Sequence, residues 1–151
     1  VHHGNGTQDT FYEDGSVFFS STHQSPWYPF TGAAGETGEG PGRNSTLNVP
    51  LPAGSGMQEI EQAWIDRLLP ALDRFQPDLL LLSAGFDSRA GDPLGQFTLQ
   101  DDDFAQLTRL LRQCADRHAE GRLISVLEGG YNLIGLRAAV TAHTTALFAG
   151  D

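Results

Sequence analysis

Three glycine-rich motifs each hold one residue whose chemistry suits a metal site. They are His2 in Val-His-His-Gly-Asn-Gly, Asp87 in Ser-Ala-Gly-Phe-Asp-Ser-Arg and Tyr131 in Glu-Gly-Gly-Tyr-Asn. Imidazole nitrogen and carboxylate oxygen are ligands of Zn²⁺, and a tyrosine hydroxyl donates a hydrogen bond. Each motif leads into a glycine-rich turn, and the second and third follow hydrophobic runs, which is where parallel α/β proteins place their active sites. We therefore predict one metal site with a hydrogen-bond donor beside it.

Each motif taken alone has a simpler explanation. Only one of two neighbouring histidines on an extended backbone can face a given site, because side chains alternate. An aspartate in a turn, such as Asp87 or Asp92, usually accepts local backbone hydrogen bonds. A tyrosine that follows a strand usually packs against its neighbours. The prediction therefore depends on the three motifs occurring together and in this order.

The composition narrows the classes of partner. The 151 residues have a net charge of −10, and all nine basic residues are arginine. Nucleic-acid binding rests on neutralising phosphates, so we expect none. The acidity either favours encounter with a cationic substrate or only keeps the protein in solution.

Cys114 is the single cysteine, so no intrachain disulfide can form. We expect Cys114 to be a buried structural thiol. No apolar run is long enough to span a membrane, and the default expectation is a cytoplasmic protein.

The hydrophobic pattern predicts alternating strands and helices. The predicted strands are 16–21, 46–49, 79–82 and 123–127, and the predicted helices run from Ser55 to Pro77, from Thr98 through Cys114, and from Asn132 to about Phe148. A long loop rich in glycine and proline, residues 22–43, carries an aromatic cluster that favours a functional role. This order predicts right-handed βαβ units on a parallel sheet.

In order and spacing, the three motifs resemble the C-terminal half of the histone deacetylase and acetylpolyamine amidohydrolase family. The Glu-Gly-Gly-Tyr form and the Pro-Trp-Tyr-Pro segment are most similar to bacterial and class II-like members. The resemblance covers nearly all 151 residues. It implies a three-layer arginase-like α/β fold with a central parallel sheet. Residues 1–151 would then be the C-terminal portion of one deacetylase domain, with the N-terminal portion absent.

The resemblance also implies a role for individual residues. His2 and Asp87 correspond to ligands of a catalytic Zn²⁺, although nitrogen and oxygen ligands would also accept Fe²⁺, and Tyr131 corresponds to the donor that stabilises the oxyanion. His3 and Asp92 fall at supporting or structural positions. Leu94 and Gly130 match the walls of an acyl-lysine channel. The aromatic wall matches either Tyr28 or Trp27, because the correspondence needs a gap of one residue in this segment. The positions that match sites for a monovalent cation such as K⁺ are Phe11, Asp14, Val17, Ser21 and Thr22.

Some parts of the family site have no counterpart here. The family has an aspartate two positions before the ligating histidine and a His-His general base further upstream, and residues 1–151 supply neither. An arginase-like dinuclear manganese site would need a second aspartate where this chain has Arg89. We therefore expect the isolated chain to be inactive and to bind zinc weakly. A halved sheet exposes apolar edges, so we also expect poor solubility or association, including homo-oligomers.

The predicted activity is zinc-dependent hydrolysis of the amide in acetyl-lysine of proteins or peptides. Two alternatives stay open. One is an acetylpolyamine amidohydrolase, because an acidic surface suits an acetylated polyamine as well as a basic peptide. The other is a module that binds acyl-lysine without hydrolysing it, although such a module has no need for a metal together with an oxyanion donor. None of these three activities requires a membrane partner.

Overall fold

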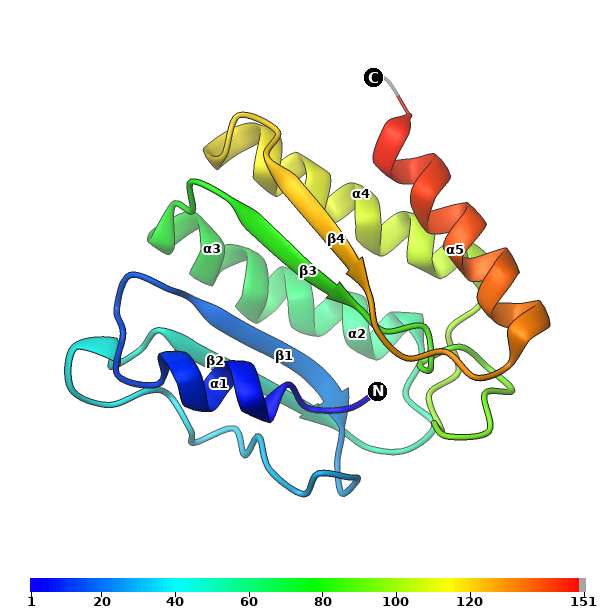
Figure 1. Cartoon of the computed structure of the whole chain (residues 1–151), viewed down its shortest axis with the longest axis horizontal. Helices are drawn as coiled ribbons and strands as arrows, with labels where there is room; N and C mark the ends of the chain where they lie inside the picture. Colours follow the sequence, from blue (N-terminus) through cyan, green and yellow to red (C-terminus); the bar gives the residue numbers. More distant parts are fainter. Residues whose placement is uncertain (150–151) are drawn as a thin grey trace.

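A computed structural model describes residues 1–149 of the chain (Figure 1). The helices and strands in chain order are α1 (Asn5–Phe11), β1 (Phe19–Gln24), the 3-10 turn η1 (Gly40–Gly42), β2 (Thr46–Leu51), α2 (Met57–Ala63), the π-helical turn η2 (Trp64–Leu68), α3 (Leu69–Phe75), β3 (Leu80–Ala84), α4 (Asp101–His118), β4 (Leu123–Leu127) and α5 (Leu133–Phe148).

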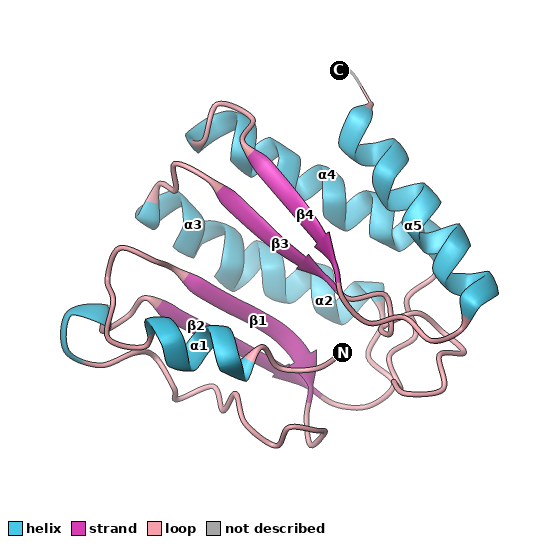
Figure 2. Cartoon of the chain, in the orientation of Figure 1, coloured by secondary structure: helices cyan, strands magenta, loops and turns pink. Residues whose placement is uncertain are grey.

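The strands form two parallel pairs. β1 pairs with β2 from Phe19–Thr46 to Gln24–Leu51, and β3 pairs with β4 from Leu80–Leu123 to Ala84–Leu127. The two pairs are not hydrogen-bonded to each other, although all four strands point the same way (Figure 2). Helices α2, α3 and α4 lie behind the strands and α1 lies in front of β1 and β2 (Figure 1). The predicted α/β class with parallel strands is confirmed.

The helix predicted from Ser55 to Pro77 is confirmed, but it is not uniform. Pro70 has no backbone N–H to donate, so the helix cannot keep an unbroken ladder of i→i−4 bonds. It passes instead through the π-helical turn η2, in which the nitrogen of Leu69 donates to the carbonyl of Trp64. Gln76 ends the helix in the left-handed conformation, directly before Pro77.

Two apolar clusters fill the space between the strands and the helices. One lies under the site end of the molecule and contains Val1, Ile60, Ala84, Phe86, Phe97, Leu99, Phe104, Leu107 and Ala139. The other lies between α3, α4 and the start of β3, and contains Leu68, Leu72, Leu80, Leu111, Cys114, Ala115 and Ala119. Burial raises the pKa of the Cys114 thiol, which keeps it neutral and unreactive.

Several boundaries differ from the prediction, and one helix was not predicted. Strand β2 does not end at Val49 but continues through Pro50 to Leu51, whose carbonyl accepts from the nitrogen of Ser25. Helix α1 was not predicted, because its Asn-Gly-Thr start is typical of a turn. Strand β1 begins at Phe19 instead of Ser16, because Phe18 packs on Phe75 before the pairing with β2 starts. Helix α4 begins at Asp101 instead of Thr98, because the nitrogen of Leu99 donates to the carbonyl of Ser88 and keeps this stretch extended. Among the described residues, no helix has the length and apolar character needed to cross a bilayer.

Candidate metal centre

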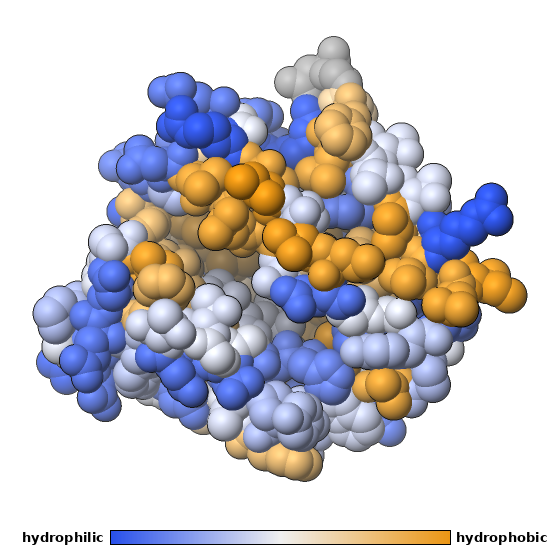
Figure 3. Space-filling view, viewed as in Figure 1, coloured by the Kyte–Doolittle hydropathy of each residue, from blue (hydrophilic) through white to orange (hydrophobic). Residues whose placement is uncertain are grey.

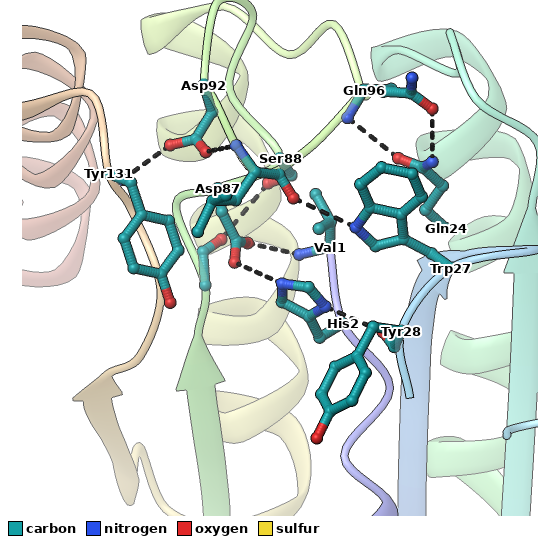
Figure 4. A network of polar contacts seen from close by, with 12 residues as sticks. Val1, His2, Gln24, Trp27, Tyr28, Asp87, Ser88, Asp92, Gln96 and Tyr131 are labelled. Atoms are coloured by element: carbon teal, nitrogen blue, oxygen red, sulfur yellow. Dashed lines mark hydrogen bonds and ion pairs between the residues drawn. The ribbon is translucent and has the colours of Figure 1, made fainter. Parts of the chain in front are cut away.

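The three motifs meet at the carboxyl ends of the parallel strands (Figure 4). His2 lies beside the end of β1, Asp87 follows β3 and Tyr131 follows β4. The Asp87 carboxylate is the most enclosed of the three groups, and the residue is only 1% exposed. Strand ends that share one edge of a sheet bring residues far apart in the chain together.

The Asp87 carboxylate lies in a cradle that only small groups can form. Its Oδ1 accepts a hydrogen bond from the backbone nitrogen of Val1. A Cβ at Gly129 would collide with Oδ2, and a Cβ at Gly95 would collide with the Asp87 carbonyl oxygen. These close approaches require glycine at both positions. The paired glycines at 129 and 130 after a strand predict a tight turn and a close approach, whereas the prediction assigned no role to Gly95.

His2 has a defined tautomer. Its Nδ1 lies 2.9 Å from the carbonyl oxygen of Tyr28, and a carbonyl oxygen can only accept, so Nδ1 carries the proton. Nε2 is left with a lone pair and lies 3.7 Å from Oδ2 of Asp87, which is too far for a hydrogen bond. Two acceptors that face each other at this distance leave room for a metal ion between them.

The donors fit a metal such as zinc. Zn–N bonds measure about 2.0–2.1 Å and Zn–O bonds about 2.0–2.2 Å, so one ion can bind both Nε2 of His2 and Oδ2 of Asp87. Within residues 1–149, however, no third histidine, cysteine, aspartate or glutamate joins this pair. Catalytic zinc sites use three protein ligands. The described residues therefore form part of a site.

A second carboxylate, Asp92, fixes the loop that holds Tyr131. Its Oδ2 accepts from the backbone nitrogens of Tyr131 at 2.7 Å and Asn132 at 3.3 Å, and its Oδ1 accepts from that of Leu94 at 2.8 Å. The Asn132 side chain caps α5 by accepting from Gly135. Asp92 therefore joins the turn after β3 to the turn after β4. It accepts hydrogen bonds from backbone nitrogens both in its own turn and in the next one.

The Tyr131 side chain is held by its backbone while its ring stays open to solvent. The residue is 50% exposed, and within the described part of the chain its hydroxyl has no hydrogen-bond partner. Gly130 before it has φ of 143°, and a Cβ there would press on Leu136 and Phe86. The hydroxyl is therefore free to bind a ligand, and glycine at 130 lets the backbone turn toward it.

The aromatic residues of the long loop take different positions. Trp27 packs against the apolar core, and its Nε1 donates to the carbonyl of Leu94 at 3.1 Å. Tyr28 is 68% exposed and meets the His2 ring edge to face at 6.1 Å. Figure 4 shows the Tyr28 and Tyr131 rings on either side of the pair formed by Asp87 and His2. Tyr28 is thus the ring of the long loop that contacts His2, and Trp27 joins the same loop to Leu94.

Two glutamines that the prediction did not include hold the same loops together. The side chain of Gln24 donates to that of Gln96 at 2.8 Å, and the backbone nitrogen of Gln96 donates back to Gln24 at 2.9 Å. Amide side chains in loops carry no distinctive spacing, so the sequence held no signal for this pair.

His3 points away from Asp87 into a buried polar network. Its Nε2 donates to Oε1 of Gln8 at 3.0 Å, and its Nδ1 accepts from Thr31 at 2.8 Å. The Gln8 amide donates to Glu36 at 2.6 Å and accepts from Asn48 at 2.7 Å. His3 therefore orders the start of α1 and the long loop without reaching the metal pair.

His23 lies beside this network and stays neutral. Its ring is 4.8 Å from that of His3, Nε2 donates to the carbonyl of Gly32 at 3.1 Å, and Nδ1 accepts from the Ser21 hydroxyl at 3.0 Å. Burial and the adjacent His3 lower the pKa of His23 to about 4.

The residues predicted for monovalent cations fall in two places. Ser21 and Thr22 lie on β1, where the Thr22 hydroxyl accepts from Trp64 at 2.9 Å. Phe11, Asp14 and Val17 lie in the turn after α1, joined by backbone bonds from Asp14 to Phe11 and from Val17 to Asp14.

Arg89 occupies the place where a dinuclear site would need a second aspartate. Its guanidinium makes two bonds to the Asp101 carboxylate, at 2.6 and 3.2 Å, and the bond to Asp101 raises the pKa of Arg89. The side chain is therefore committed to α4 and supplies a cation where a second metal would require an anion.

Comparisons with known proteins show the family to which the chain belongs. Residues 1–147 match the histone deacetylase domain, and the chain belongs to the histone deacetylase family. It is 46% identical over 151 residues to a chloroplastic protein named histone deacetylase 10 from Oryza sativa subsp. japonica, covering all of this chain and 34% of that protein. It is 46% identical over 134 residues to a histone deacetylase-like amidohydrolase from Pseudomonas aeruginosa, covering 87% of this chain and 35% of that protein.

Solved structures show the same fold. The chain overlays on the HDA15 HD domain with a TM-score of 0.91 and 37% identity, covering 97% of this chain and 42% of that one. It overlays on the histone deacetylase Clr3 with a TM-score of 0.90. The chain thus spans about a third of the curated relatives named above and about two-fifths of the HDA15 domain.

Proposed function

We propose that these residues form part of a zinc-dependent deacetylase that hydrolyses the amide of acetyl-lysine in proteins or peptides. The observation that supports this most directly is the lone pair of His2 Nε2 facing Oδ2 of Asp87 at 3.7 Å, next to the unpaired hydroxyl of Tyr131. A cation would bridge Nε2 of His2 and Oδ2 of Asp87. The Tyr131 hydroxyl would donate a hydrogen bond to a developing oxyanion.

His2 and Asp87 would hold the metal, which when bound polarises an acyl carbonyl and lowers the pKa of a bound water. Tyr131 donates a hydrogen bond to the acyl oxygen, and one such donor contributes roughly 2.7–4 kcal/mol to transition-state stabilisation. Asp92 holds that donor in place through the backbone. Tyr28, Leu94 and Gly130 would border the acyl group, since apolar walls suit the methylene stem of lysine.

The net charge of −10 supports a substrate with positive charge around the acetyl group. Fe²⁺ would suit the same nitrogen and oxygen donors as zinc, and K⁺ would suit the carbonyl-rich turn at Phe11, Asp14 and Val17. The cytoplasmic location remains a prediction. Because residues 1–149 supply two of the ligands that a catalytic zinc needs, we expect the chain by itself to bind zinc weakly and to lack activity.

A chimera tests the proposal. Residues 1–151 would replace the matching 151 residues of the rice relative, and zinc content and hydrolysis of a fluorogenic acetyl-lysine peptide would be measured. We expect turnover that requires the metal and that falls by about 100-fold or more in Tyr131→Phe. Tyr12→Phe, on the far side of α1, is the matched control. Full metal content without turnover of the peptide would contradict the proposal, and turnover of acetylated polyamines alone would replace its substrate.

A further inference from the structure

Tyr28 and Leu94, which would border the acyl group, belong to two halves of the molecule that share no strand pairing within residues 1–149. Tyr28 lies in the loop between β1 and β2, and Leu94 lies between β3 and α4. β1 and β2 form one parallel pair, and β3 and β4 form the other. Figure 3 shows a hollow between the more polar β1–β2 half and the apolar surface over β3 and β4. Contacts outside the strands must therefore fix how far apart Tyr28 and Leu94 lie.

Trp27 bonds directly across these two halves, to the backbone of Leu94. The indole Nε1 donates to the carbonyl oxygen of Leu94 at 3.1 Å. The backbone nitrogen of the same leucine donates to Oδ1 of Asp92 at 2.8 Å. Because hydrogen bonds weaken steeply as their geometry departs from linear, Leu94 cannot turn without weakening one of the two. We call Trp27, Leu94 and Asp92 the clamp.

The clamp also reaches the candidate metal ligand and the candidate oxyanion donor. The carbonyl that accepts from the indole belongs to the peptide that joins Leu94 to Gly95, and a Cβ at Gly95 would collide with the Asp87 carbonyl oxygen. Oδ2 of Asp92 accepts from the backbone nitrogen of Tyr131 at 2.7 Å. The position of the Leu94 side chain is therefore tied to that of both reactive groups.

The opposite wall is anchored separately. The carbonyl oxygen of Tyr28 accepts from Nδ1 of His2 at 2.9 Å, and the two rings meet edge to face. One dipeptide, Trp27 and Tyr28, is thus bonded to Leu94 at its first residue and to a candidate metal ligand at its second (Figure 4). The side chains of Tyr28 and Leu94 are both exposed, so each presents apolar surface from a backbone that hydrogen bonds hold in place.

A second link joins the same segments without touching Leu94. The side chains of Gln24 and Gln96 make the reciprocal bonds described above, at 2.8 and 2.9 Å. Loss of this pair would loosen the two segments while the Leu94 carbonyl stays bonded to Trp27. The pair therefore offers a graded comparison with the indole bond.

We infer that Trp27 is a positioning residue that makes the site select a short acyl group. The inference rests on the proposed function, in which Tyr28 and Leu94 border that group. A wall that is held at both polar atoms of its backbone does not move aside for additional methylene groups, and apolar pockets discriminate by about 10–200-fold for one methylene. The indole N–H supplies this constraint, whereas the ring of Trp27 packs on the apolar core.

The test compares an acetyl-lysine peptide with a butyryl-lysine peptide in the rice chimera. Trp27→Phe keeps an aromatic ring and removes only the N–H, and the lost bond is solvent-exposed, so the variant should fold. We expect the ratio of kcat/KM for butyryl over acetyl peptide to rise by about 10-fold, mainly through a lower KM for the butyryl peptide. An unchanged ratio would overturn the inference, because a general loss of order lowers both rates together.

Trp64→Phe is the matched control. Trp64 is half-buried like Trp27, and its Nε1 donates to the Thr22 hydroxyl at 2.9 Å, so this variant also loses one indole hydrogen bond. It should leave the ratio unchanged, and an equal rise in both tryptophan variants would overturn the inference. Gln96→Leu removes one bond of the amide pair and should raise the ratio by less than Trp27→Phe. A larger rise in Gln96→Leu would also count against Trp27.

Failure of the proposed function would give a different result. If the chimera hydrolyses neither peptide, calorimetric binding of both peptides reads the same ratio without turnover, and Trp27→Phe should shift it by about 10-fold. Binding of neither peptide would overturn the inference together with the proposed function. In residues 1–151 alone, Trp27→Phe should speed hydrogen exchange of the Leu94 amide by about 10-fold, whereas Trp64→Phe should not. Unchanged exchange would show that the clamp does not hold Leu94.

Discussion

Two polar networks lie at opposite sides of the Val1–Gly4 segment, and they differ in how far their groups are paired with one another. The network of His3, Gln8, Glu36 and Asn48, here called the closed network, pairs its histidine, amide and carboxylate groups with one another, and only Oδ1 of Asn48 is buried without a partner among its described atoms. The network of His2 and Asp87 ends in two acceptors 3.7 Å apart. A closed network fixes the fold, whereas an open one has binding capacity left over. Adjacent histidines in the sequence thus serve different purposes.

The largest effect should come from filling the cradle of the open network. Gly129→Ala places a Cβ against Oδ2 of Asp87, so we expect a loss of about 3 kcal/mol in the free energy of unfolding, as for overpacked cores. Zinc binding by the chimera should fall with it. Gly6→Ala is the control, since a Cβ there meets nothing within 4 Å. Urea unfolding of both variants measures the difference, and equal stabilities would show that the cradle relaxes.

Removal of the Asp92 carboxylate should rank next. Asp92→Ala leaves the nitrogens of Leu94, Tyr131 and Asn132 without their acceptor, and hydrogen bonds to charged groups contribute about 1.5–3 kcal/mol each before water replaces them. We expect a net loss of about 2–3 kcal/mol. Asp116→Ala, at an exposed position of α4, should change the stability far less. A similar loss in both variants would remove the special role of Asp92.

His23, which lies beside the closed network, should make the stability of the fold depend on pH. Its pKa is lowered from the ordinary 6.5 to about 4 by burial, so the folded state resists the proton that the unfolded state accepts. The contribution of neutral His23 to the free energy of unfolding is complete above pH 6.5. It is lost as the pH falls from 6.5 toward 4, by up to about 1.4 kcal/mol per pH unit. His23→Gln should flatten this dependence. Urea unfolding near neutral pH and about two units lower tests it, and an unchanged slope would assign the effect elsewhere.

The smallest effect on stability should come from the open side of the site. The Tyr131 hydroxyl has no partner within residues 1–149, so Tyr131→Phe should change the free energy of unfolding by less than about 0.5 kcal/mol. The same variant is expected to abolish most turnover in the chimera. A clear loss of stability would indicate that the hydroxyl supports the fold, and the comparison of the two networks would then fail at this residue.

Strand ends and motif order allowed much of this arrangement to be predicted. Hydrophobic runs located β3 and β4 to within two residues, and the parallel order predicted that the turns after them meet. Helix α1 could not be predicted, because its packing against β1 outweighs the turn-like start of its sequence. The reach of Asp92 to Tyr131 depends on two turns meeting in space. Local patterns contain no information on such contacts, and the paired glycines do not reveal that the group approaching Gly129 is the Asp87 carboxylate.

The cradle around Asp87 has a genetic consequence. The Asp87 carboxylate occupies its position only because Gly129 has no side chain. Every amino-acid substitution that one nucleotide change can produce from a glycine codon adds at least a Cβ, and several add a charge. No amino-acid substitution that a single nucleotide change produces at position 129 is therefore expected to be neutral. Variation at this site should arise first at rim positions such as Tyr28 and Leu94, where a new side chain meets solvent instead of the carboxylate.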